Sequence, residues 1–280
     1  MLEKSHISGF ADEIDPSMDV QLALLDKLGV KYIEFRSGDG TGVADYTNEQ
    51  AVALKARLDA AGVKVSAVGS PIGKIGIEDD FAPHMEKFKH VVELAKIFDT
   101  PYIRMFSFFI PEGKNPDDYR DEVLARTAQF VEYAKEQNVI LLHENEKGIY
   151  GDNAARCLDL MKNFYGDHFK CTFDFANFVQ CKQDTLEAYE LLKDYITYVH
   201  IKDAQWDTGK VVPAGMGDGH VKEILTKLSE SGYEGFLSLE PHLADFAAFK
   251  SLENNGSALE IGSGTVAFTT AYNALKEIIG

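Results

Sequence analysis

Four apolar segments in the second half of the chain end in a side chain that can bind a cation or transfer a proton. The four residues are Glu144, Asp174, His200 and Glu240. A carboxylate at the end of an apolar strand is often only its first solvated residue, but four such endings in succession predict a shared site. Three neighbouring carboxylates repel one another and are costly to bury unless a cation lies among them. Three carboxylates and one imidazole suit a divalent ion such as Mn²⁺, Mg²⁺ or Co²⁺, and no cysteine joins them to favour structural zinc.

Two arginines near the predicted strand ends are candidates for substrate contacts. Arg36 ends the second predicted strand and Arg104 lies inside the fourth. An arginine in an apolar strand seldom stays without an anionic partner. That partner is either a bound ligand or a carboxylate of the chain, for which Glu34 and Glu144 are the candidates.

Four further residues are placed near the same edge by their spacing. Lys202 follows His200 by two residues, so both side chains point to the same side of a strand. Lys74 lies in the turn after the third predicted strand. Glu146 and His242 stand two residues beyond the two glutamates of the predicted metal site. We expect Lys74 and Lys202 to contact substrate, whereas a site role and a surface position stay equally open for Glu146 and His242.

Other polar features have simpler explanations. The glycines of residues 215–219 permit either backbone contacts to a phosphate or a tight turn before the helix at 221, and the turn is the favoured interpretation. Trp206 either stacks on a sugar ring or covers the end of the barrel. His143 alternates with Glu144 and is predicted to pack away from the site. No partner is predicted for four other histidines, which are His6, His84, His90 and His168.

The elements that must position these residues alternate along the chain at intervals of about thirty residues. Short β-branched or aromatic runs predict strands at 6–10, 32–36, 63–68, 102–106, 139–144, 171–174, 197–202 and 235–240. Apolar residues at helical spacing predict helices at 18–28, 48–61, 81–95, 124–131, 154–164, 186–192, 221–228 and 268–278.

This alternation predicts an α/β fold, a parallel sheet covered by helices. Eight strand–helix units in about 250 residues match a closed (β/α)₈ TIM barrel, in which catalytic residues lie at the carboxyl ends of the strands. An open doubly wound sheet is expected to carry a glycine-rich phosphate fingerprint after its first strand, and the residues at 9–12, Gly-Phe-Ala-Asp, do not form one. No linker or low-complexity tract interrupts the chain, so we predict a single domain over residues 1–280.

Composition excludes several classes of protein. Of the 280 residues, 45% are hydrophobic and 26% are charged, as in ordinary globular domains. The net charge of −17 makes nucleic acids and anionic membranes unfavourable partners. No apolar run approaches the roughly 20 residues of a spanning helix, and the N-terminus lacks the apolar core of a signal peptide. The three cysteines form no Cys-x-x-Cys pair, so we expect a reduced, cytoplasmic protein.

The strand ends together resemble those of the sugar phosphate isomerase/epimerase family, the xylose-isomerase-like TIM barrels. The resemblance runs from Gly-Phe-Ala-Asp-Glu at 9–13 through Tyr-Val-His-Ile-Lys-Asp at 198–203 to Glu-Pro-His at 240–242. It implies that Glu144, Asp174, His200 and Glu240 bind a divalent metal, with Mn²⁺ first and Mg²⁺, Co²⁺ or Zn²⁺ as alternatives. It also implies that Glu144 and Glu240 transfer protons. Several epimerases of the family have a substrate-contacting histidine where this chain has Asn177, which can donate a hydrogen bond but cannot act as an acid or base.

The function implied is a metal-dependent isomerase or epimerase of a sugar or sugar phosphate. It would abstract a proton beside a carbonyl and pass through a metal-bound enediolate. A dehydratase or a lyase acting on a 3-keto-glycoside would use the same site and the same first step. An AP endonuclease would need a multi-zinc, histidine-rich site and a basic surface, and a non-catalytic sugar-binding module is the remaining alternative. The resemblance further implies a homo-oligomer, either a dimer or a tetramer.

Overall fold

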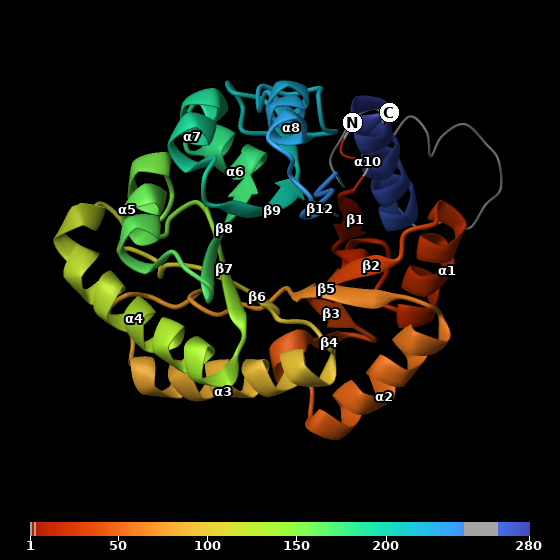
Figure 1. Cartoon of the computed structure of the whole chain (residues 1–280), viewed down its shortest axis with the longest axis horizontal. Coiled ribbons are helices and arrows are strands. Elements are labelled where there is room, and N and C mark those ends of the chain that lie inside the picture. Colours follow the sequence, from red (N-terminus) through yellow and green to blue (C-terminus); the bar gives the residue numbers. More distant parts are fainter. Residues whose placement is uncertain (1, 3, 244–262) are drawn as a thin grey trace.

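Eight parallel strands form one sheet in the computed structural model, which describes residues 2, 4–243 and 263–280. The order is β1-β12-β9-β8-β7-β6-β5-β2. The two end strands of this order, β1 and β2, are also in contact, so the sheet nearly closes into a barrel (Figure 1). The strands are β1 His6–Gly9, β2 Tyr32–Phe35, β5 Lys64–Val68, β6 Tyr102–Met105, β7 Ile140–Glu144, β8 Phe169–Asp174, β9 Ile196–Ile201 and β12 Phe236–Leu239.

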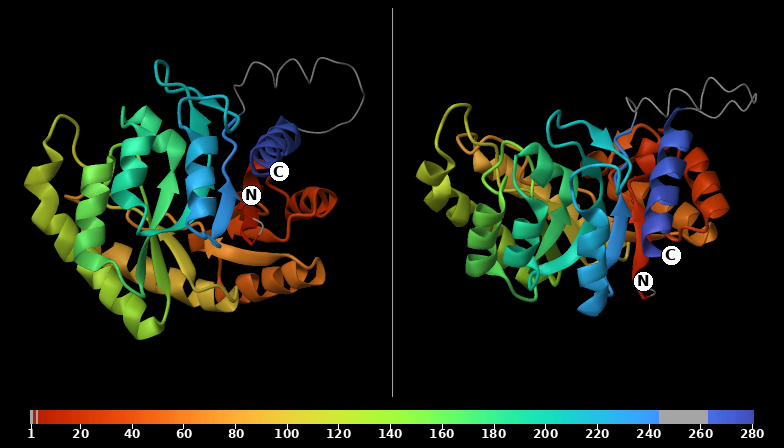
Figure 2. Two further views of the ribbon diagram at one scale, coloured as in Figure 1. Left: turned by 45° about the horizontal axis from the view of Figure 1, so that its top comes forward. Right: turned by 90° about the horizontal axis from the view of Figure 1, so that it is seen from above.

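Helices surround the barrel, as the turned views make plain (Figure 2). They are α1 Met18–Leu28, α2 Asn48–Ala60, α3 Phe81–Ile97, α4 Arg120–Gln137, α5 Ala154–Phe164, α7 Thr185–Leu192, α8 Val221–Glu230 and α10 Ser263–Ile279. Local hydrogen bonds and backbone conformation determine where the helices begin and end. A capping box of Thr47 and Gln50 begins α2, and Gly29, with φ of +69°, ends α1 in the left-handed conformation that glycine adopts without strain.

The apolar core lies between the strands and the helices, where outward-facing side chains such as Ile33, Ile103 and Phe173 are buried. The barrel interior is more polar. The hydroxyl of Ser66 hydrogen-bonds to those of Ser8 and Tyr198, at 2.7 and 2.8 Å. These hydroxyls satisfy one another in the middle of the barrel, and the charged groups gather above them at the carboxyl ends of the strands.

The predicted TIM barrel and its eight strand–helix units are confirmed, with strand and helix ends that differ by a few residues. The sequence patterns missed a short helix, α6 Phe175–Gln180, and two small hairpins, β3 Ser37–Gly38 with β4 Thr41–Gly42 and β10 Asp203–Ala204 with β11 Val211–Val212. These elements are too short to have a recognisable period. The predicted single domain includes residues 244–262, which lie outside the described residues.

None of the described helices is both long and apolar enough to cross a lipid bilayer.

Candidate active site

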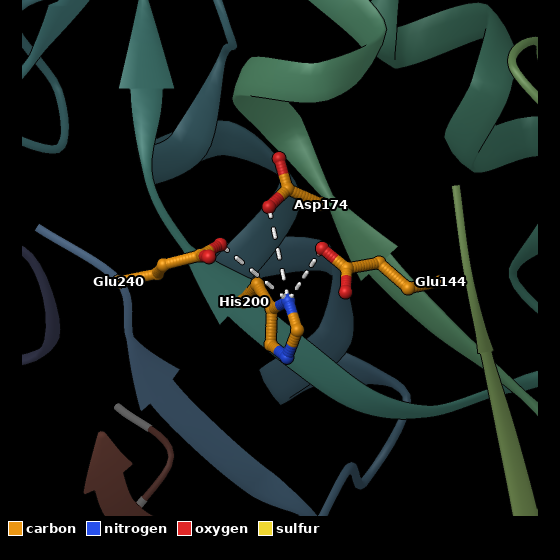
Figure 3. Close-up of side chains that lie close together, drawn as sticks. All are labelled: Glu144, Asp174, His200 and Glu240. Carbon is orange, nitrogen blue, oxygen red and sulfur yellow. Dashed lines mark ion pairs between the residues drawn. The ribbon is translucent and has the colours of Figure 1, made fainter. Parts of the chain in front are cut away.

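The four predicted metal-binding residues come together at the carboxyl end of the barrel (Figure 3). Glu144 and Asp174 end β7 and β8, His200 lies in β9, and Glu240 follows β12 directly. In the parallel register Asp174 pairs with His200, and His200 pairs with Ser238. One ligand atom from each of the four residues lies within 4.8 Å of the others, and all four residues are buried. Two metal–ligand bonds of about 2.0–2.4 Å span that separation, so a single ion can reach all four.

The unsatisfied atoms of this cluster fit a divalent cation. Asp174 begins α6 as its N-cap, and its Oδ1 accepts the backbone N–H of Asn177 at 2.7 Å. Its Oδ2 and Nδ1 of His200 are buried and make no hydrogen bond of good geometry, and their near neighbours are charged groups. Oδ2 of Asp174 lies 3.1 Å from Nζ of Lys202, and Nδ1 of His200 lies 3.0 Å from Oε1 of Glu144 and 3.8 Å from Oδ2 of Asp174. The donor set of oxygens and one imidazole nitrogen is one that divalent metals accept.

The orientation of His200 depends on Glu34, which the sequence suggested only as a partner for an arginine. Nε2 of His200 donates to Oε2 of Glu34 at 3.0 Å, and Ser238 donates to the same oxygen at 2.7 Å. A carboxylate behind a ligating imidazole fixes its tautomer and aims its other nitrogen. The available signal was a lone acidic residue inside the apolar strand β2, two positions before Arg36.

Burial and charge shift the protonation of this cluster. Burial raises the pKa of Asp174 to about 7. For His200, burial opposes the charged form, but the adjacent Glu144 and Glu34 carboxylates outweigh it and raise the pKa well above its usual value. For Glu144 and Glu240, burial is outweighed by nearby cationic groups, chiefly His200 and Lys202 respectively, and both pKa values are lowered. Without a cation, the groups of the cluster that hold extra protons near neutral pH are therefore Asp174 and His200. Metal binding at such a site releases protons.

Three further predicted residues contact the carboxylates of the cluster. Nζ of Lys202 lies 2.7 Å from Oε2 of Glu240 and 3.1 Å from Oδ2 of Asp174. Arg104 donates to Oε2 of Glu144 at 3.3 Å, so of the two alternatives left open by the sequence its anionic partner in this structure is a carboxylate of the chain. The Asn177 side-chain amide donates to Oε1 of Glu144 at 3.2 Å. The guanidinium of Arg104 also lies over two aromatic rings, those of Phe10 and Phe106.

Arg36 also has partners within the chain, but they are neither of the two candidate carboxylates, Glu34 and Glu144. Arg36 instead contacts Asp12 at 2.8 Å, Glu13 at 3.2 Å and Glu240 at 3.5 Å. Glu34 lies one layer deeper in the barrel, where its carboxylate is taken by His200 and Ser238. Arg36, beyond the end of β2, reaches the segment after β1 instead.

A cavity of about 450 Å³ opens beside the cluster, a size that suits a small metabolite. Four of the six predicted substrate contacts line it, namely Arg36, Lys74, Arg104 and Glu146, whereas Asn177 and Lys202 do not; Glu240 and His242 line it as well. Lys74 pairs with Glu146 at 3.1 Å, and His242 pairs with Glu13 at 3.1 Å. Both positions left open by the sequence, Glu146 and His242, therefore face the cavity.

Other singled-out residues lie elsewhere. His143 is buried outside the barrel against Ser107, as predicted, and Trp206 is not among the residues that line this cavity. The glycine loop forms a turn around Asp203. The four unassigned histidines have partners in the structure: His6 contacts the rings of Tyr32 and Phe236, His84 bonds to Gly73, His90 to Tyr46 and His168 to Val139.

Comparison with known proteins gives a family match over most of the chain. The model of the xylose isomerase-like TIM barrel family matches residues 22–260. An uncharacterized protein of Methanocaldococcus jannaschii is 26% identical over 191 residues, which cover 65% of this chain and 64% of that protein. The 3-dehydroshikimate dehydratase of Bacillus anthracis is 23% identical over 129 residues, 46% of each chain. The match thus spans less than two thirds of either curated relative.

Solved structures share the fold at low sequence identity. A D-tagatose 3-epimerase-like protein superposes with a TM-score of 0.74 at 17% identity, over 98% of both chains. The IOLI protein, solved with a zinc atom, superposes with a TM-score of 0.76 at 15% identity, again over 98% of both chains.

Proposed function

The chain belongs to the xylose isomerase-like TIM barrel family, and we propose on that basis that it is a divalent-metal-dependent sugar isomerase or epimerase. The observation that carries the proposal is the buried cluster, in which three carboxylates converge on Nδ1 of His200 and one ligand atom of each residue lies within 4.8 Å of the others. Glu144, Asp174, His200 and Glu240 would hold the ion, with Mn²⁺ as the first candidate.

A bound divalent ion would supply Lewis-acid polarisation of a carbonyl group, which acidifies the neighbouring C–H bond. The chain's own residues would move the proton. Glu240 lines the cavity, and Glu144 reaches the cluster from β7, with β8 and β9 between their strands. Two carboxylates on opposite sides of a substrate suit epimerisation through both faces, whereas isomerisation needs only one face.

The remaining residues would orient the substrate. Arg36, Lys74, Arg104 and Glu146 line the cavity and offer hydrogen bonds to hydroxyl groups. Asn177 and Lys202 contact the carboxylates of the cluster and would hold these in place. We further propose a cytoplasmic protein that forms dimers or tetramers and acts on small sugars.

A dehydratase is the second candidate. It is favoured by the similarity to 3-dehydroshikimate dehydratase, and it starts with the same proton removal beside a carbonyl. Elimination then requires departure of a hydroxyl group, for which a cationic donor beside the cluster is useful. Lys202, next to Glu240, is such a donor.

Solvent exchange separates the candidates. The Mn²⁺-loaded protein is incubated in D₂O with D-tagatose or with 3-dehydroshikimate, and the products are followed by NMR. Deuterium beside the carbonyl together with an isomeric sugar supports the isomerase or epimerase, and loss of water supports the dehydratase. Equal exchange by loaded and chelator-treated protein would contradict metal dependence.

A further inference from the structure

The two carboxylate oxygens of Glu240 have different surroundings. Oε2 lies 2.7 Å from Nζ of Lys202 and 3.8 Å from Nδ1 of His200, so it belongs to the cluster proposed to bind a metal (Figure 3). Oε1 lies 3.5 Å from Nη1 of Arg36 and 3.5 Å from Nε2 of His242, and both of these residues line the cavity. One oxygen of Glu240 is therefore placed for a metal ion and the other for a substrate in the cavity.

All three nitrogens of the Arg36 guanidinium group contact carboxylates of the chain. Nε lies 2.8 Å from Oδ2 of Asp12, Nη2 lies 3.2 Å from Oε1 of Glu13, and Nη1 is the nitrogen that contacts Glu240. The face of the group lies over the ring of Phe10, 4.5 Å from its centroid. A planar fork with a partner on each nitrogen has a fixed orientation, so Arg36 holds the Glu240 carboxylate relative to the segment after β1.

The two carboxylates that hold Arg36 are themselves anchored. Oδ2 of Asp12 also accepts the hydroxyl of Ser37 at 3.0 Å, and Oε2 of Glu13 accepts the backbone N–H of His242 at 2.7 Å. Both residues follow β1 closely, and β1 pairs with β12 and contacts β2. Arg36 is therefore held by a network that joins the carboxyl ends of three neighbouring strands.

The contact between Arg36 and Glu240 leaves Oε1 able to take a proton. A charge-assisted hydrogen bond between such groups is typically about 2.7–2.9 Å long. Nη1 of Arg36 lies 3.5 Å from Oε1, so the hydrogen bond is weak while the attraction between the two charges persists. That attraction fixes the rotation of the carboxylate, and the lone pairs of Oε1 are left largely free to act as a base.

We propose that Arg36 is a positioning residue that acts through Glu240. It turns Oε2 towards the metal-binding cluster and Oε1 towards the cavity. Oε1 then takes the proton when the C–H bond of a substrate breaks and its electron pair moves into the neighbouring carbonyl group. Because each nitrogen of Arg36 is already paired, Arg36 contributes more to the rate of proton transfer than to the affinity for substrate. The proposal rests on the proposed function and deepens it.

The first test separates rate from affinity. Deuterium exchange from D₂O into D-tagatose is measured on the Mn²⁺-loaded wild type and on Arg36→Met. We expect kcat to fall about 100-fold, because a base that is misplaced by a small distance loses most of its effect, while KM changes by less than about threefold. An unchanged kcat would overturn the inference and leave the proposed function standing, and a raised KM beside it would identify Arg36 as a direct substrate contact.

Two further variants accompany this measurement. Arg57→Met is the matched control, because Arg57 contacts Asp19 and Asp39 outside the cavity and its loss changes the net charge equally, so kcat and KM should stay at their wild-type values. Arg36→Lys guards against a variant that does not fold. It keeps the positive charge, but one ammonium group cannot span three carboxylates, so kcat should still fall at least about tenfold. Full kcat in Arg36→Lys would contradict the positioning role.

The second test does not depend on turnover. Mn²⁺ is titrated calorimetrically into the wild type, Arg36→Met and Arg57→Met, after circular dichroism has shown that all three are folded. Loss of the positive charge beside Oε1 should lower the Kd of Arg36→Met for Mn²⁺ by about threefold or more, whereas a damaged site would raise it. An equal or higher Kd would contradict the inference. Absence of Mn²⁺ binding by the wild type would contradict the proposed function instead, and if D-tagatose does not exchange, this titration alone decides the inference.

Discussion

Nζ of Lys202 lies 2.7 Å from Oε2 of Glu240, inside the cluster proposed to bind a metal. The same ammonium group lies 3.1 Å from Oδ2 of Asp174, and all three side chains are buried. A single positive charge of the chain thus serves two carboxylates that a divalent ion would also bind. Lys202 therefore stabilises the metal-free site, and it competes with a divalent ion for the same two carboxylates.

Replacing Lys202 should separate these two effects. In Lys202→Met the carboxylates lose their buried partner, so the chelator-treated protein should lose about 3–5 kcal/mol of unfolding free energy. Mn²⁺ should bind more tightly, because no ammonium group has to be displaced. Urea unfolding and titration calorimetry measure the two changes. Lys193→Met, which removes an exposed lysine paired with Glu190, is the control. Unchanged stability in chelator would show that the buried pair contributes nothing.

Metal binding should stabilise the protein. An ion that binds only the folded state contributes about 2.7 kcal/mol when its concentration is 100 times its Kd. We expect Mn²⁺ to raise the melting temperature of the wild type and to leave that of His200→Gln unchanged. His90→Gln is the control. The His90 ring hydrogen-bonds to the backbone of Tyr46 and is not part of the cluster, so this variant should respond like the wild type. An equal shift in all three proteins would place the ion elsewhere.

Glu240→Gln should retain the ion and lose proton transfer. The amide oxygen is still a ligand, but an amide accepts no proton near neutral pH, and general base catalysis typically contributes about 10²–10⁴-fold. Deuterium exchange and metal content are measured on the same samples, with Glu144→Gln beside them. Similar losses in both variants would support two-face epimerisation, and a markedly smaller loss in one would support a single-face reaction. The exposed Glu234→Gln is the control. Full exchange by metal-loaded Glu240→Gln would limit this carboxylate to a ligand role.

Acid should weaken the fold through His84. Burial, assisted by the positive charges of Lys87 and Arg126, lowers the pKa of His84 from 6.5 to about 4. Its Nε2 accepts the N–H of Gly73 at 2.8 Å, a bond that only the neutral ring can accept. Between pH 6.5 and 4 the unfolded chain binds a proton that the folded chain does not, so stability falls as pH falls.

The predicted slope from His84 is at most about 1.4 kcal/mol per pH unit. His84→Gln keeps an acceptor for Gly73 and cannot titrate, so its unfolding free energy should decline less steeply over this range. Denaturant titrations at several pH values between 7 and 4 compare the two proteins. Parallel slopes would mean that His84 titrates normally in the folded protein.

The sequence by itself determined the barrel and the four residues of the candidate metal site. Periods of two and of about 3.6 residues reveal strands and helices, and their alternation leaves few topologies. In a closed barrel of parallel strands the carboxyl ends all lie on one face. The sequence alone therefore assigns Glu144, Asp174, His200 and Glu240 to a common site.

Only the tertiary structure decided which partner each charged group has. Glu34 hydrogen-bonds to His200, which is 166 positions away in the sequence. Arg36 contacts Asp12 and Glu13 and not Glu34, its near neighbour in β2. Such pairs depend on the depth of each side chain in the barrel and on the register of strands that are distant along the chain. The path of the loops decided which backbone groups contact the buried charges outside the barrel strands. The glycines after β9 surround Asp203 because a long turn brings their N–H groups to one carboxylate, a geometry that no local period encodes.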